Sequence, residues 1–168
     1  MAVCAFFLST FSFGATPDSA VKAVLLFHLA QFVHWPASAE ADVFQIGILG
    51  PDPFGAALDE AVKDEKIEGH AIVVKRSNNA ADLRDCRIVY VSPVGPESLP
   101  QIQATLKGRG ILLVGEDENF LRGGGMIIFT RTQNRKIRLE IDLDNVRSET
   151  LKVSAELLRV CTVKGGHK

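Results

Sequence analysis

Hydrophobic residues in the last third of the chain form two short apolar runs and one alternating segment. The run at 111–114 lies between two glycines, which predicts a strand buried on both faces. A second run, at 126–129, follows three glycines at 123–125 that let the backbone turn back. Residues 136–143 alternate between polar and apolar, so they predict a strand with one wet face. The centre of a sheet is therefore expected here, with its last two strands in a hairpin.

The first two thirds of the chain alternate between strand-like and helix-like patterns. Strands are predicted at 43–49, 71–75 and 87–91, helices at 53–65 and 96–107, and a short turn at 80–85 capped by Asn79. Residues 144–160 are predicted as one closing helix, with Val153, Leu157 and Val160 on its core side. The expected fold is a single α/β domain. Its mixed, mostly parallel sheet has helices on both faces and a C-terminal β-hairpin followed by a helix.

A strongly apolar helix is predicted to open the fold, from about Ala20 to Trp35, because a residue before proline disfavours the α conformation. Apolar residues surround most of its circumference. The best core face comprises Val21, Val24, Leu25, Leu29 and Phe32, and a second face comprises Leu26, Phe27, Ala30 and Val33. Either the helix is buried between layers, or another protein covers one face. Burial is the simpler interpretation, since exposed apolar patches are small in monomers.

Composition suits one folded domain, with 168 residues that are 46% hydrophobic and 23% charged. The net charge of −1 predicts no attraction to nucleic acid. One basic cluster stands out on the predicted hairpin, namely Arg131, Arg135, Lys136 and Arg138. Such charges at a strand turn are usually a solvated edge that deters aggregation. A basic patch that faces a partner is the alternative.

The N-terminus has the pattern of an export signal. Residues 2–13 are uncharged and mostly apolar, too short to span a bilayer and long enough for a signal-peptide core. Ser12 and Gly14 suit a cut after Gly14, although the usual positive segment is absent. We therefore expect a signal peptide at 1–14 and a periplasmic domain at 18–163. The alternative is an apolar first element of the fold.

No motif points to catalysis or to a cofactor. The glycine pattern at 47–55 contains two prolines and Asp52, so it indicates a tight turn and not a phosphate loop. The four histidines lack metal-binding spacing, and G-x-S-x-G is absent. The acidic residues at 116–118 lack the EF-hand pattern and predict a solvated turn. We expect no catalytic residue, no metal and no cofactor.

Four segments, taken in order, resemble the YfiR family of periplasmic regulatory proteins. They are the opening helix ending in Trp35-Pro36, the segment 46–58, the segment 83–92 around Cys86, and Gly124–Ile127 with 138–141 and 151–158. The resemblance implies a non-catalytic protein that dimerises and represses an inner-membrane diguanylate cyclase by binding its periplasmic portion. Other relatives accompany different signalling proteins, so a sensor kinase is a further candidate partner. Two departures are Asp142, where the family usually has Asn, and Ala155, where it often has a second Ser.

The sequence singles out two groups of residues for function. Phe32, Trp35 and Pro36 end the apolar helix, where aromatic anchors can bind a membrane partner. A structural role for Trp35 as a core plug is the alternative. The rival to a regulatory protein is a periplasmic small-ligand-binding sensor with its site in the crevice at the sheet end.

Cys86 and Cys161 remain after signal removal, and an even pair in an oxidising compartment suggests a disulfide. The two can meet only if the last helix lies back across the start of the 87–91 strand. Two buried free thiols are the alternative, because cysteine is often buried without a bridge.

Overall fold

The computed structural model describes residues 17–36 and 42–165. The expected signal peptide at 1–14 lies outside these residues. The helices are α1 (Pro17–Phe32), α2 (Ala56–Val62), α3 (Leu99–Leu106), α4 (Glu118–Arg122), α5 (Leu143–Ser148) and α6 (Ala155–Val160), with a 3-10 turn η1 (Ala80–Leu83). The strands are β1 (Val33–His34), β2 (Val43–Leu49), β3 (Lys66–Ile67), β4 (His70–Ser77), β5 (Ile88–Val91), β6 (Leu112–Gly115), β7 (Ile127–Arg131), β8 (Ile137–Asp142), β9 (Lys152–Val153) and β10 (Cys161–Lys164).

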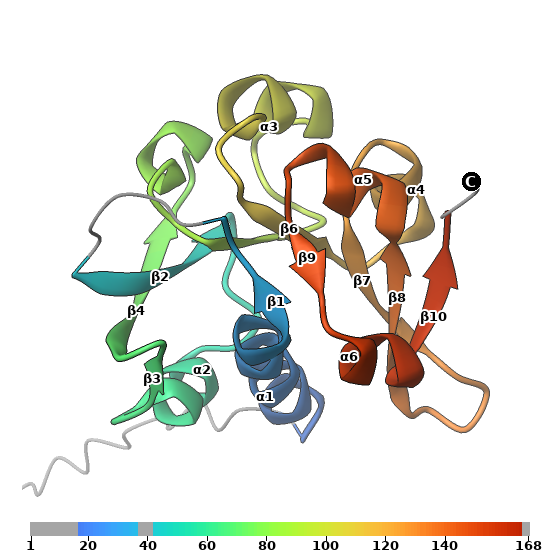
Figure 1. The fold of residues 1–168 in the computed structure, drawn as a ribbon, viewed down its shortest axis with the longest axis horizontal. Coiled ribbons are helices and arrows are strands. Elements are labelled where there is room, and N and C mark those ends of the chain that lie inside the picture. Colours follow the sequence, from blue (N-terminus) through green and yellow to red (C-terminus); the bar gives the residue numbers. More distant parts are fainter. Residues whose placement is uncertain (1–16, 37–41, 166–168) are drawn as a thin grey trace, which may run out of the picture.

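One eight-stranded sheet organises the molecule, in the order β10-β8-β7-β6-β5-β2-β4-β3 (Figure 1). Strands β4, β2, β5, β6 and β7 run parallel, and β8 returns antiparallel to β7. Strand β10 lies parallel to β8 at one edge, and β3 lies antiparallel to β4 at the other. The predicted α/β fold, its mixed sheet and its hairpin are therefore confirmed. The strand order reverses between β2 and β5, so the crevice favoured for ligands lies at their carboxyl ends.

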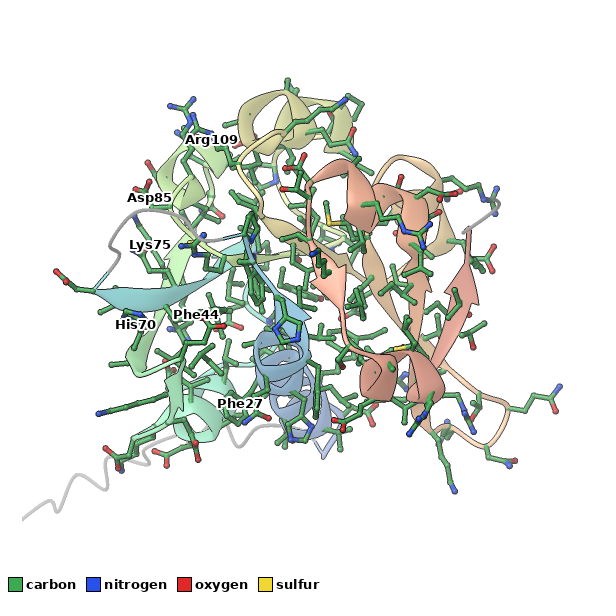
Figure 2. All side chains as sticks on the ribbon, viewed as in Figure 1. Phe27, Phe44, His70, Lys75, Asp85 and Arg109 are labelled. Carbon is green, nitrogen blue, oxygen red and sulfur yellow. The ribbon has the colours of Figure 1, made fainter. Side chains whose placement is uncertain are left out.

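Two hydrophobic clusters cover the two faces of the sheet. The larger cluster packs α1 and α2 on one face, and Phe27 of α1 and Phe44 of β2 belong to it (Figure 2). The smaller cluster packs η1, α3 and α4 on the other face. Neighbouring residues of β5 alternate between the clusters, since Tyr90 belongs to the first and Val89 to the second. Asn79 caps η1 as predicted, because its side chain accepts the N–H of Ala81 at 2.9 Å.

The opening helix differs from its prediction at its end and in its buried face. It ends at Phe32 and not at Trp35, because Val33 and His34 leave it to pair with β9. Val21 and Val24, expected in the core, are 48% and 44% exposed. The core side of the helix holds Ala23, Leu26, Phe27, Leu29 and Ala30, and Val33 of β1 is buried as well. The predicted second face, with Leu26, Phe27 and Ala30, therefore packs on the sheet and α2. Val21 and Val24 of the predicted core face point outward.

The predicted single helix at 144–160 is wrong. The chain leaves α5 after Ser148, and Thr150 adopts a left-handed φ of 60° that no α-helix contains. Strand β9 follows, and Ser154 then caps α6 by accepting the N–H of Leu157 at 3.2 Å. Leu157 is buried as expected. Val160 is 64% exposed, because α6 ends there and the chain turns into β10.

Candidate functional site

One exposed face of α1 is apolar. Val21 and Val24 are exposed, Leu25 is half-buried, and Phe32 continues the row half-buried at the end of the helix. Exposed His28 lies in the same row, with its ring edge-on to that of Phe32 at 6.4 Å between centroids. Spacings of three, four and seven residues place these side chains along one side of a helix. We call this row the α1 face.

The predicted anchors Phe32, Trp35 and Pro36 lie at the C-terminal end of the α1 face, but their exposures differ. Trp35 is half-buried and stands edge-on to Phe44, with ring centroids 5.2 Å apart. Its indole N–H donates to the carbonyl oxygen of Arg87 at 3.2 Å. Pro36 is exposed, and Phe32 is half-buried. Trp35 therefore ties the chain to the sheet, and Phe32 and Pro36 stay accessible beside it.

The end of α1 is held in place by a strand that the sequence did not predict. Val33 pairs with Val153 and His34 with Lys152 in a two-stranded antiparallel sheet. The N–H of Ser154 also donates to the carbonyl oxygen of Phe32 at 2.9 Å. The α1 face is thus presented by a fixed helix, which lowers the entropic cost of binding a partner.

Charged groups at the carboxyl ends of the parallel strands mostly satisfy one another. Glu116 accepts the hydroxyl of Tyr90 at 2.5 Å and pairs with Lys22 at 2.7 Å. Burial, and then the hydrogen bond to Glu116, raise the pKa of Tyr90 and keep it neutral. Arg76 binds Asp52 at 2.7 Å and Asp59 at 2.8 Å. These pairs indicate structural roles, and no group of metal-binding side chains occurs in the described part of the chain.

The predicted acidic turn at 116–118 has specific local partners. Asp117 caps α4 by accepting the N–H of Phe120 at 2.9 Å. Glu118 pairs with Arg122 at 2.9 Å and with Lys164 at 3.6 Å, and the hydrogen bond from Arg122 is the main cause that lowers the pKa of Glu118. The turn is therefore a helix start.

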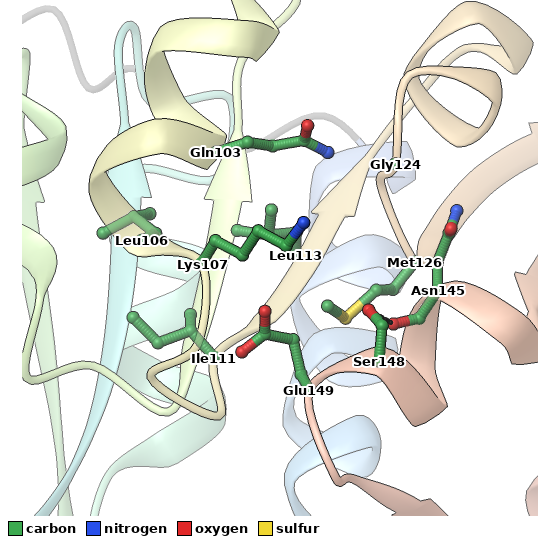
Figure 3. Close-up of a pocket in the computed structure, with 10 residues that line it drawn as sticks. All are labelled: Gln103, Leu106, Lys107, Ile111, Leu113, Gly124, Met126, Asn145, Ser148 and Glu149. Atoms are coloured by element: carbon green, nitrogen blue, oxygen red, sulfur yellow. Dashed lines mark hydrogen bonds between the residues drawn. The ribbon is translucent and has the colours of Figure 1, made fainter.

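A cavity of about 240 Å³ lies between α3 and α5 (Figure 3). Its apolar wall comprises Leu106, Ile111, Leu113 and Met126. Glu149 projects into it and is only 7% exposed, and its carboxylate accepts the N–H groups of Gly108 at 2.8 Å and Gly110 at 3.0 Å. Among residues 17–36 and 42–165, no basic side chain pairs with Glu149, although Lys107 also lines the cavity. Sequence reasoning missed Glu149, because it placed the residue inside a helix.

The suggested bridge between Cys86 and Cys161 is not formed, since both are free thiols. Cys86 packs in the cluster under η1 and α3, and Cys161 packs against the cluster on the α1 side. The sheet separates them, and α6 does not cross the start of β5. Burial raises the pKa of each thiol to about 11.

The fold and the α1 face define a mixed α/β domain with an accessible apolar helix surface. No helix in the described residues is long and apolar enough to cross a membrane. The chain belongs to the YfiR/HmsC-like family, whose model matches residues 19–162. This is a family of periplasmic proteins known for regulation and not for catalysis.

Comparison with solved structures adds a remote likeness. The chain is similar to a conserved domain protein from Vibrio cholerae O1 biovar eltor strain N16961, with 12% identity and a TM-score of 0.48. The alignment covers 72% of this chain and 54% of that one, so this chain spans about half of that protein's length. No curated protein matches the chain.

Proposed function

We propose that the chain is a non-catalytic periplasmic regulator that binds and represses an inner-membrane signalling protein, such as a diguanylate cyclase or a sensor kinase. The observation that carries the proposal is the α1 face. The chain belongs to a family known for regulation, and its helix α1 leaves Val21 and Val24 exposed, although the opposite side of α1 is buried in the core. Apolar side chains on a fixed helix are suited to docking in the groove of a partner.

At the C-terminal end of the α1 face, half-buried Phe32 and exposed Pro36 supply the accessible anchors, and Trp35 next to Pro36 packs on Phe44 of the sheet. Buried aromatic anchors contribute most of the energy in typical interfaces. The partner would therefore cover Val21, Val24 and Phe32 together. Export by the signal peptide at 1–14 would bring the protein to the periplasmic side of that partner.

Deleting the gene tests repression directly. If the partner is a diguanylate cyclase, deletion raises cellular cyclic di-GMP, and the wild-type gene restores the basal level. Val24→Glu on the α1 face should fail to restore it, because a charge would be desolvated at the interface. Val94→Glu is the matched control, since Val94 is 74% exposed in the loop after β5.

If both variants restored the basal cyclic di-GMP level equally, the α1 face would not be required for repression. If neither variant restored the basal level although both proteins were present in normal amounts in the periplasm, the added charge alone would explain the effect. Unchanged cyclic di-GMP after deletion would point to a different output, and phosphorylation of a sensor kinase would then be measured in the same strains.

We also propose that the protein is a homodimer, as the family resemblance implies. Sedimentation equilibrium of the purified mature chain measures its mass over a range of concentrations. A mass twice that of the chain supports the dimer, and a single-chain mass at every concentration contradicts it.

The alternative function, a periplasmic small-ligand sensor, is favoured by the cavity at Glu149. The hollow of about 270 Å³ at the ends of β5 and β6 suits a ligand less well. Its carboxylates are already engaged, because Glu97 accepts the N–H of Ala80 and Glu116 pairs with Lys22. Among the residues that the structure describes, the donors to the Glu149 carboxylate are the neutral N–H groups of Gly108 and Gly110, so a small apolar molecule with an amino group would complete its hydrogen bonds.

Thermal unfolding with a panel of small amines and amino acids tests the sensor. A ligand that binds only the folded state raises the melting temperature in proportion to the logarithm of its concentration. Glu149→Gln should abolish that rise even if it lowers the starting melting temperature. A panel without any concentration-dependent rise contradicts this alternative.

A further inference from the structure

We propose that the tip of the β7–β8 hairpin binds the anionic phospholipid headgroups of a membrane surface. This proposal rests on the proposed function, because it adds a contact with the membrane in which the partner would be embedded. Residues 131–138 read Arg-Thr-Gln-Asn-Arg-Lys-Ile-Arg and contain four basic and no acidic residues. All four basic side chains are exposed.

The backbone of the tip is fixed, so the charges have a defined position. The N–H of Thr132 donates to the carbonyl oxygen of Lys136 at 2.9 Å, and the N–H of Arg135 donates to that of Thr132 at 2.9 Å. Arg135 takes a left-handed φ of 60° at the turn. The loop extends beyond the ends of the neighbouring strands (Figure 1). The tip can therefore touch a flat surface without obstruction by the sheet.

Most of the tip's charge is not neutralised within the protein. Arg131 pairs with Asp18 at the start of α1. Within residues 17–36 and 42–165, Arg135, Lys136 and Arg138 form no ion pair. Three uncompensated cations on a protein of net charge −1 create a local positive field.

An exposed apolar side chain lies beside strand β8 of the same hairpin. Cys161 pairs with Leu139 of β8, and Val160 directly before it is 64% exposed. Cations beside an exposed aliphatic group are typical of surfaces that rest on headgroups. The pair of Arg131 with Asp18 also places the tip at the end of the molecule where α1 begins.

The basic residues at the hairpin tip are better suited to a lipid surface than to an acidic site on a protein. The polar residues Thr132, Gln133 and Asn134 separate the charges, and the hollow beside Arg131 is also lined by Glu116 and Glu118, which disfavour a bound carboxylate. Each basic side chain near an anionic bilayer raises partitioning by about fivefold. The attraction falls off within the Debye length of roughly 8–10 Å, so it acts only at the surface.

Co-sedimentation of the mature chain with vesicles tests the proposal without any partner. The vesicles are phosphatidylcholine with or without about 30 mol% phosphatidylglycerol. We expect binding only to the anionic vesicles, and its loss in about 0.5 M NaCl. The double variant Arg135→Gln/Lys136→Gln should partition about 25-fold more weakly.

The matched control is Lys63→Gln/Lys66→Gln, which removes the same charge from exposed lysines near β3 at the far edge of the sheet. Unchanged binding of this control supports the hairpin as the site. Equal losses in both double variants, or equal binding to neutral vesicles, overturn the proposal. If the hairpin variant no longer binds the membrane partner in cells and the wild type does not bind anionic vesicles, the hairpin tip contacts a protein instead of lipid. Because the vesicles contain no protein, a lack of vesicle binding would not contradict the proposed role of the α1 face.

Discussion

The side chain of Trp35 has a structural and a functional interpretation that two measurements separate. Its ring contacts Phe44 edge-on, and its N–H reaches the carbonyl oxygen of Arg87. Trp35→Ala removes both contacts at a half-buried site, so we expect a loss of about 2 kcal/mol in the free energy of unfolding. Trp35→Phe keeps an aromatic contact and should lose less. Urea denaturation of the two variants measures these losses.

Partner affinity decides between the two roles of Trp35. A functional anchor predicts that Trp35→Ala weakens the complex by about 2 kcal/mol beyond any loss of folded protein. Affinity that is unchanged after correction for the folded fraction would assign Trp35 to structure alone.

The two free thiols predict a dependence of stability on pH. Burial raises the pKa of Cys86 and of Cys161 from 9.0 to about 11. The unfolded chain therefore ionises first as pH rises. Their contribution to stability is complete below pH 9 and is lost between pH 9 and pH 11. The free energy of unfolding should fall less steeply over this range in Cys86→Ala/Cys161→Ala than in the wild type, and parallel curves would contradict the assignment.

Single residues were predictable where their role is local. Asn79 could be recognised as a cap because its partner, Ala81, is two residues away. The pairing of Cys86 with Cys161 could not be judged, because it depends on which face of the sheet each thiol occupies. Glu149 was missed because residues 144–160 were predicted as one helix and because its partners, Gly108 and Gly110, lie about 40 residues earlier in the sequence.

Among the elements, α5 depends on the residue that caps its start, Asp142. Asp142 accepts the N–H groups of Asp144 and Asn145, both at 3.0 Å. Asp142→Ala removes this cap and should cost about 1 kcal/mol of stability. Asp142→Asn keeps an acceptor oxygen, so it should cost less than about 0.5 kcal/mol.

Chemical denaturation of the two Asp142 variants measures the difference. Equal losses would mean that the negative charge, and not the hydrogen bonds of the cap, holds the start of α5.

The α5–β9–α6 segment shows why the closing helix was mispredicted. Val153, Leu157 and Val160 are spaced as on one helix, and this periodicity outweighed the polar residues between them. In the protein, Val153 pairs with Val33 in a strand, and Ser154 begins a new helix. That pairing joins residues 120 positions apart, so no local pattern announces it.

At the scale of the molecule, alternating strands and helices were enough to predict the sheet and its two covered faces. The orientation of α1 was not, because the helix is apolar on nearly all sides and only the assembled sheet selects which side is buried. The side left outward carries Val21 and Val24, and the proposed function depends on it.

Photocrosslinking in cells shows whether the outward side of α1 contacts a membrane protein. A photoreactive residue replaces Val24 on the α1 face or Val94 in the control loop, and crosslinked products from the membrane fraction are identified by mass spectrometry. We expect position 24, and not position 94, to capture an inner-membrane protein with a cytoplasmic signalling domain. Crosslinks from position 24 to no membrane protein, or the same membrane protein captured equally from both positions, would contradict it.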